Sequence, residues 1–191
     1  MQTFIIVLSL SFNCMLDAFH HASGVWISRS KKTYCCRPAN KNKLRKLLKA
    51  IIRQNNGKLE TRYMAIALLE SGARIGTRSG DSGRACGVFQ IHARYSYPLM
   101  HLRKNSDLID WRRRTFPNQR LLTRKECTNL RNYNYSVKVM KRLFQLMDKR
   151  NKHPCHHNSG IYSSVCDYWY KQRINIWTLY FEYKKYQCSR K

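Results

Sequence analysis

Seven consecutive apolar residues, Tyr63 to Leu69, leave a helix that contains them without any polar face. Such a helix is stable only where other parts of the chain cover it on all sides, so residues 59–70 are expected at the centre of a domain. The preceding segment, residues 43–55, predicts one such cover. Its apolar residues recur at helical spacing and lysine and arginine fill the other positions; they are Leu44, Leu47, Leu48, Ile51 and Ile52. A basic helix that binds a membrane surface or nucleic acid is the less favoured interpretation.

The rest of the chain also indicates helices rather than strands. Apolar residues recur at the three- and four-residue spacing of a buried helix face over residues 131–149. An aromatic helix is expected over residues 168–186. A Gly/Ser-rich loop, residues 73–84, precedes a short helix predicted over residues 85–92. The long segment 93–131 has no clear pattern. Because no repeat and no persistent strand alternation is visible in the 191 residues, we expect a mostly α fold in a single domain.

The beginning of the chain is typical of a secretory signal peptide. Residues 4–12 are apolar and small residues follow at 22–24, which predicts a signal peptide over residues 1–24 that is cleaved near Gly24. The missing Lys or Arg at its start departs from that pattern, so a short buried helix or strand is the alternative. Residues 25–42 are basic and irregular, and the folded domain is expected over residues 43–191.

The eight cysteines favour an oxidising compartment, and hence a secreted, periplasmic, envelope-bound or virion-associated protein. No Cys-x2-Cys pair is present, so no metal site is expected, although Cys155 lies beside His156 and His157. The pairing cannot be assigned from spacing alone. Cys86 and Cys155 are the candidates for a bond, because they lie near Gln90 and Asn158, in two segments that we expect to border a ligand-binding cleft. Removal of residues 1–24 would leave seven cysteines, an odd number.

The charge limits the partners more than the fold. The chain carries 37 Lys and Arg against 10 Asp and Glu, a net charge of +27. That balance favours nucleic acid, anionic lipid or an acidic polymer such as the cell wall as partner. Nucleic acid is the less favoured of these, because Arg112, Arg113 and Arg114 are accompanied by no recognised binding motif.

Glu70 follows the apolar run directly, so its carboxyl group is expected to be partly removed from water. Burial raises the pKa of a carboxyl group, and the C-terminal end of a helix acts in the same direction, as a general acid requires. Gln90 and Asn158 are candidates to bind sugar hydroxyl and acetamido groups through their amides. On composition alone, a solvent-exposed Glu at a helix end is the favoured alternative.

Three segments in order resemble the soluble lytic transglycosylase family of lysozyme-like domains. They are Ala-Ile-Ala-Leu-Leu-Glu-Ser-Gly at 65–72, Ala-Cys-Gly-Val-Phe-Gln-Ile at 85–91 and His-Asn-Ser-Gly at 157–160. A fourth family element is matched loosely by residues 132–140. The resemblance covers about residues 43–187. His157 stands where the family usually has Tyr, and Ser136 where it usually has Gly.

The resemblance implies a lysozyme-like fold of the goose-type kind and cleavage of the β-1,4 bond between N-acetylmuramic acid and N-acetylglucosamine. Glu70 would be the single catalytic acid and then base, and the saccharide cleft would be lined by Ser71, Gln90, Asn158 and Tyr170. The expected protein is a monomer without cofactor that acts on peptidoglycan glycan strands. Anionic envelope polymers, or the machinery of secretion or of a phage, are further candidate partners.

Asp81 supports a second enzymatic interpretation. It lies in the loop before Gly87, at a place in the sequence similar to that of an acidic residue in goose-type lysozymes. It would orient a water opposite Glu70, and the protein would then be a muramidase that hydrolyses the same bond. The favoured alternative is a loop residue that caps the segment 85–92 or pairs with Arg84.

Overall fold

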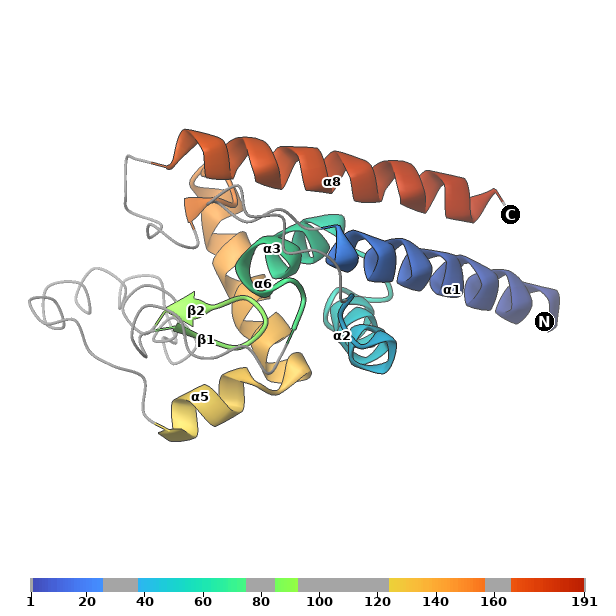
Figure 1. Cartoon of the computed structure of the whole chain (residues 1–191), viewed down its shortest axis with the longest axis horizontal. Helices are drawn as coiled ribbons and strands as arrows, with labels where there is room; N and C mark the ends of the chain where they lie inside the picture. The colour runs from blue at the N-terminus through green and yellow to red at the C-terminus, as the bar shows by residue number, and fades with distance from the viewer. Residues whose placement is uncertain (1, 26–37, 75–84, 93–123, 157–165, 191) are drawn as a thin grey trace, which may run out of the picture. The chain divides into compact units, whose positions relative to one another are not determined.

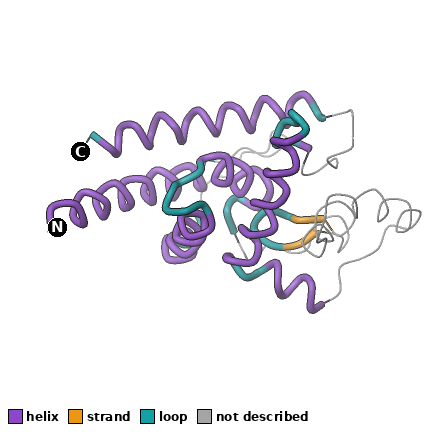
Figure 2. The backbone as a smooth tube through the Cα atoms, turned by 180° about the vertical axis from the view of Figure 1, so that it is seen from behind, coloured by secondary structure: helices purple, strands orange, loops and turns teal. Residues whose placement is uncertain are grey.

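The computed structural model describes residues 2–25, 38–74, 85–92, 124–156 and 166–190 of the chain, without the side chains of residues 2–10 and 92. The described part is mostly helical, as predicted, with six helices and one two-stranded sheet (Figures 1 and 2). Its contacts divide the chain into two compact units, a division that the sequence does not indicate. The first unit comprises Met1–Arg74 and Gln172–Lys191, and the second comprises Ile75–Lys171.

The first unit is built around α3 (Thr61–Ser71), whose residues from Tyr63 to Leu68 are all buried. This confirms the prediction from the apolar run. Helix α2 (Lys41–Gln54) covers part of the core with the face predicted from its periodicity; the buried members of that face are Leu44, Leu47, Leu48 and Ile51. The α2 helix begins after Asn40, whose Oδ1 accepts a hydrogen bond from the Lys43 N–H at 3.1 Å.

Helices α1 (Gln2–Gly24) and α8 (Tyr168–Ser189) lie side by side in the first unit (Figures 1 and 2). The Phe19 and Phe181 rings meet edge to face with centroids 5.4 Å apart, and Cys14 is bonded to Cys188. Helix α1 also packs on α2 and α3 and buries Met15 completely. The segment predicted to be a leader is therefore helical and contributes to the core, and its cleavage stays a prediction.

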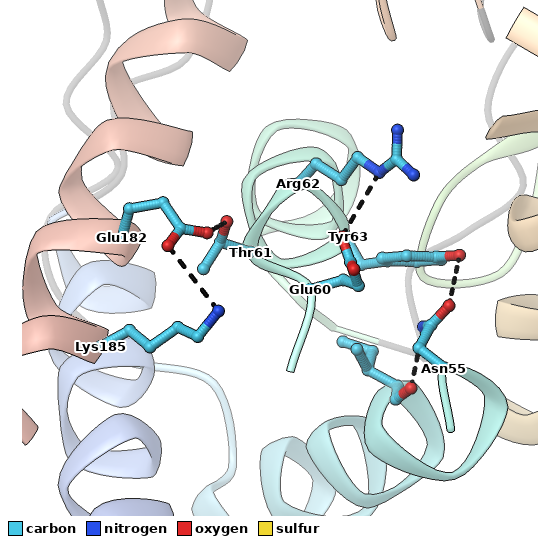
Figure 3. Close-up of polar contacts among 8 residues, drawn as sticks. Asn55, Glu60, Thr61, Arg62, Tyr63, Glu182 and Lys185 are labelled. Atoms are coloured by element: carbon cyan, nitrogen blue, oxygen red, sulfur yellow. Dashed lines mark hydrogen bonds and ion pairs between the residues drawn. The ribbon is translucent and has the colours of Figure 1, made fainter. Parts of the chain in front are cut away.

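Polar contacts fix the N-terminal end of α3 on both sides (Figure 3). Thr61 Oγ1 donates a hydrogen bond to the carboxylate of Glu182 on α8, and Glu182 also pairs with Lys185 at 3.7 Å. On the other side, the Tyr63 hydroxyl donates to Asn55 Oδ1 at 3.4 Å, just beyond the end of α2. These contacts tie the N-terminal end of the central helix to α8 and to the end of α2.

The second unit contains α5 (Arg124–Leu130), α6 (Tyr133–Lys149) and a small sheet. Helix α6 confirms the prediction for residues 131–149, and the buried residues of its predicted core face are Val137, Met140, Leu143, Phe144 and Met147. Asn132 caps it by accepting a hydrogen bond from the Tyr135 N–H at 3.1 Å. Helix α5 lies in a segment where the sequence shows no pattern, and Leu130 is its one buried residue.

The prediction of a helix over residues 85–92 is wrong, because this segment forms a β-hairpin. Strands β1 (Ala85–Cys86) and β2 (Ile91–His92) pair antiparallel, with Ala85 opposite His92. Gly87 and Gln90 have φ values of +81° and +45°, a left-handed conformation that a right-handed helix does not contain. The Gln90 N–H donates to the Gly87 carbonyl at 3.1 Å and closes a four-residue turn between the strands.

Three disulfides join described cysteines: Cys14–Cys188, Cys86–Cys127 and Cys155–Cys166. The candidate bond between Cys86 and Cys155 is wrong, because each of these residues is bonded to another cysteine. Cys35 and Cys36 lie outside the described residues. The bonds indicate an oxidising environment. None of the helices among the described residues is long and apolar enough to cross a membrane.

Candidate functional site

Glu70 is placed by the C-terminal end of α3. The six residues from Tyr63 to Leu68 are at most 1% exposed, whereas Glu70 itself is half-buried. Ser71 is buried, and its Oγ donates a hydrogen bond back to the Ala67 carbonyl at 3.1 Å. Glu70 therefore lies at the boundary between the core of the first unit and its surface.

Two left-handed residues end the helix directly after this pair. Gly72 and Ala73 both have a φ of +59°. The N–H groups of Gly72 and Ala73 donate to the carbonyls of Leu68 and Ala67, each at 2.8 Å. A glycine in this conformation is a common helix terminator, but alanine adopts it only at a cost of about 1 kcal/mol. The chain thus turns sharply after Ser71, and the backbone that carries Glu70 is fixed by the hydrogen bonds of the turn.

Gln90 occupies the turn between β1 and β2 in the second unit. Its side chain is buried, and Nε2 donates to the Gly87 carbonyl at 2.9 Å. The same carbonyl accepts the Gln90 backbone N–H, so the amide helps to hold its own turn. The sequence predicts a sugar-binding amide here and does not reveal this local bond. Saccharide binding by Gln90 stays a prediction.

Gly87 lies in close contact with a neighbouring segment of the second unit. A Cβ atom at this position would lie 2.3 Å from the Leu130 carbonyl oxygen, because the turn approaches the end of α5 closely. The Cys86–Cys127 bond joins the same two segments. The hairpin and α5 are therefore held together by one covalent bond and one backbone contact that admits only glycine.

Replacing Gly87 by alanine is expected to lower the free energy of unfolding by about 3 kcal/mol, from the left-handed conformation and the clash with Leu130 together. Gly57→Ala is the matched control, since Gly57 has a φ of +82° with no atom near its missing Cβ. It should cost about 1 kcal/mol, from conformation alone. Urea denaturation of both variants measures the difference. Equal losses would show that the Leu130 contact has no energetic effect.

The remaining predicted site residues are divided between the two units and the undescribed segments. Tyr170 is buried in the first turn of α8, and its N–H donates to Asp167 Oδ1 at 2.7 Å. It belongs to the second unit, with Gln90, whereas Glu70 and Ser71 belong to the first. Asp81 and Asn158 lie outside the described residues. The assembly of these side chains into one cleft stays a prediction.

One group of side chains in the described residues has the composition of a metal site. The ligand atoms of His153, Cys155 and Cys166 lie within 4.8 Å of one another. The two sulfur atoms are bonded to each other, and His153 Nδ1 accepts a hydrogen bond from the Cys155 N–H at 3.2 Å. Because metals bind cysteine as the thiolate, the oxidised cluster offers imidazole alone.

Burial raises the pKa of two tyrosines among the described residues. Removal from water raises the pKa of Tyr133, the first residue of α6, to about 12. The same cause raises the pKa of Tyr180 on α8 above its usual value of 10.0. Both phenols stay protonated at neutral pH.

No family model matches the chain, and neither a curated protein nor a solved structure matches it.

Proposed function

We propose that the protein is a lytic transglycosylase that cleaves the N-acetylmuramic acid to N-acetylglucosamine bond of peptidoglycan. The observation that supports this most is the place of Glu70. It is a half-buried acidic residue near the end of a helix that is mostly buried, and it is followed by a sharp turn. A general acid needs such a boundary position, where it is partly shielded from water and still reaches a ligand.

The proposed reaction needs only the Glu70 carboxyl group. Glu70 donates its proton to the glycosidic oxygen as the bond from that oxygen to C1 of the muramoyl sugar breaks. The C6 hydroxyl oxygen of the same sugar then attacks C1 and gives its proton to the Glu70 carboxylate. The products are a free 4-hydroxyl group on the glucosamine sugar and a 1,6-anhydro-muramoyl end, and Glu70 is protonated again.

A single carboxylate is chemically sufficient because the attacking hydroxyl belongs to the substrate. Two-carboxylate glycosidases use the second group as a nucleophile or to activate water. Intramolecular attack in a favourable orientation corresponds to an effective concentration of roughly 10⁵ M or more, so no second enzymic base is needed. In the muramidase alternative, water attacks instead and Asp81 assists it.

Digestion of purified peptidoglycan, followed by mass spectrometry of the released muropeptides, tests the proposal. We expect masses that are lower by one water than those of reducing-end fragments, because the anhydro end forms without hydrolysis. Fragments with reducing ends would instead establish the muramidase alternative. The absence of any released fragment from the oxidised, folded protein would contradict both enzymatic proposals.

A further inference from the structure

Helix α8 has apolar side chains on two opposite faces. Ile174, Phe181 and Cys188 follow one another at intervals of seven residues and are at most 2% exposed, so they form the inner face. A second apolar set has exposed fractions between 58% and 69%; this outer stripe consists of Ile176, Leu179, Tyr183 and Tyr186. At about 100° per residue the outer stripe lies on the side of the helix opposite Phe181.

The outer stripe is continuous, and its four side chains are exposed in the part of the chain that the structure describes. Its members are three or four residues apart, so they are neighbours on the helix surface over about 15 Å. The core of the first unit takes up the inner face and leaves the outer stripe exposed. Large side chains that a core does not use, gathered in one stripe, are typical of an interaction surface.

A pocket of about 610 Å³ adjoins this stripe in the first unit. Asp17 and His21 line it from α1, and Tyr180, Lys184 and Arg190 line it from the C-terminal part of the chain. Tyr183 and Tyr186 belong both to the pocket and to the outer stripe. The Cys14–Cys188 bond borders the pocket and fixes the two helices that form it.

The pocket presents positive charge beside aromatic rings. Lys184 Nζ lies 5.9 Å from the ring centroids of Tyr180 and Tyr183, and the Arg190 guanidinium lies 5.6 Å from that of Tyr186. The single carboxylate in the lining, Asp17, is paired with Lys41 of α2. Because Lys41 balances the charge of Asp17, Lys184 and Arg190 leave an excess of positive charge around the pocket, which attracts an anion.

The charge of the chain selects the kind of partner. A second copy would bring another net charge of +27 against the same face, and that repulsion opposes self-association. An anionic surface is complementary to it. Exposed Tyr, Leu and Ile beside Lys and Arg are also the residues of helices that lie in the interface of an anionic bilayer.

We propose that the outer stripe and the adjoining pocket dock the protein on an anionic lipid membrane. Ile176 and Leu179 enter the interface with the two stripe tyrosines, while Lys184 and Arg190 bind a headgroup phosphate in the pocket. The helix lies on the bilayer and does not cross it. This surface is independent of the proposed reaction at Glu70, so either proposal can fail without the other.

Co-sedimentation with vesicles of equal parts phosphatidylglycerol and phosphatidylcholine tests the proposal. The wild-type protein is expected to bind these vesicles and not vesicles of phosphatidylcholine alone. Ile176→Asn/Leu179→Asn should lower the partition coefficient by roughly a hundredfold, about tenfold per aliphatic side chain. Its circular dichroism and unfolding free energy should match those of the wild type, because both side chains are exposed.

A matched pair of charge variants tests the pocket. Lys184→Gln should weaken vesicle binding by about fivefold. Lys49→Gln removes the same charge from the exposed face of α2, outside the pocket, and should change binding by less than about twofold. Equal effects of the two would contradict headgroup binding in the pocket.

Two other results would overturn the membrane proposal. Unchanged vesicle binding by the Ile176→Asn/Leu179→Asn variant would show adsorption by net charge alone. A concentration-dependent dimer in ultracentrifugation, lost in the same variant, would show that a second copy covers the outer stripe.

Discussion

Glu70→Gln is expected to reduce the rate of peptidoglycan cleavage by roughly a thousandfold or more, because an amide keeps the shape of the side chain but has no proton to transfer. The fold should be unaffected. Glu70 is half-buried beyond the buried part of α3, and the turn that comes after it is held by backbone hydrogen bonds of Gly72 and Ala73. The initial rate of muropeptide release measures the loss, and circular dichroism checks the fold.

Glu60→Gln provides the matched control at the other end of the same helix. Glu60 is also half-buried, and its carboxylate pairs with the Arg62 side chain at 3.7 Å. The chemical change is identical, but the proposed reaction does not use this group, so activity should stay within about twofold of wild type. Equal loss in both variants would assign the effect to α3 rather than to the Glu70 proton. Full activity of Glu70→Gln would contradict the proposed mechanism.

Local burial explains which elements the sequence predicts. The apolar run from Tyr63 to Leu69 and the spacing of leucines in residues 43–55 reflect which side chains leave water, and α3 and α2 form accordingly. The periodicity of residues 131–149 predicts α6 for the same reason. The same apolar run predicts Glu70 at the end of α3, but it does not decide how far this residue is buried, because a Glu at a helix end is commonly exposed.

Contacts between distant residues explain the elements that the sequence does not predict. The hairpin at 85–92 depends on left-handed residues at Gly87 and Gln90 and on the bond from Cys86 to α5. The pattern of apolar and polar residues along the sequence indicates neither the left-handed conformations nor the disulfide partner. Helix α5 buries only Leu130, so it has no apolar face to detect.

The pairing of α1 with α8 is the most distant of these contacts, and the sequence of α1 favours a different interpretation. Residues 4–12 have the composition of a signal-peptide core, which indicates export rather than packing. Phe19 and Cys14, which contact α8, lie just beyond that stretch. The pocket and the outer stripe are therefore not predictable from the sequence. Both exist only because α1 lies beside α8 and the opposite face of α8 stays exposed.

Loss of the Cys14–Cys188 bond is expected to lower the free energy of unfolding by about 5 kcal/mol. The two cysteines are separated by 174 residues, so the bond closes a loop through nearly the whole chain and removes much of the freedom of the unfolded state. A typical protein has only about 5–15 kcal/mol of stability, so the double variant Cys14→Ala/Cys188→Ala should unfold at far lower urea concentration. The unfolding midpoint at neutral pH measures this.

Cys155→Ala/Cys166→Ala is the control with a short loop. These residues are only 11 apart in sequence, so their bond restricts the unfolded chain less and its loss should cost about 3 kcal/mol. Each double variant removes one disulfide, and the loop length is the main difference between them. If the two losses were equal, chain entropy would not explain the stabilisation. A Cys14→Ala/Cys188→Ala variant as stable as the wild type would show that α1 and α8 need no covalent link, and that Met15 and Phe19 hold α1 in place by packing alone.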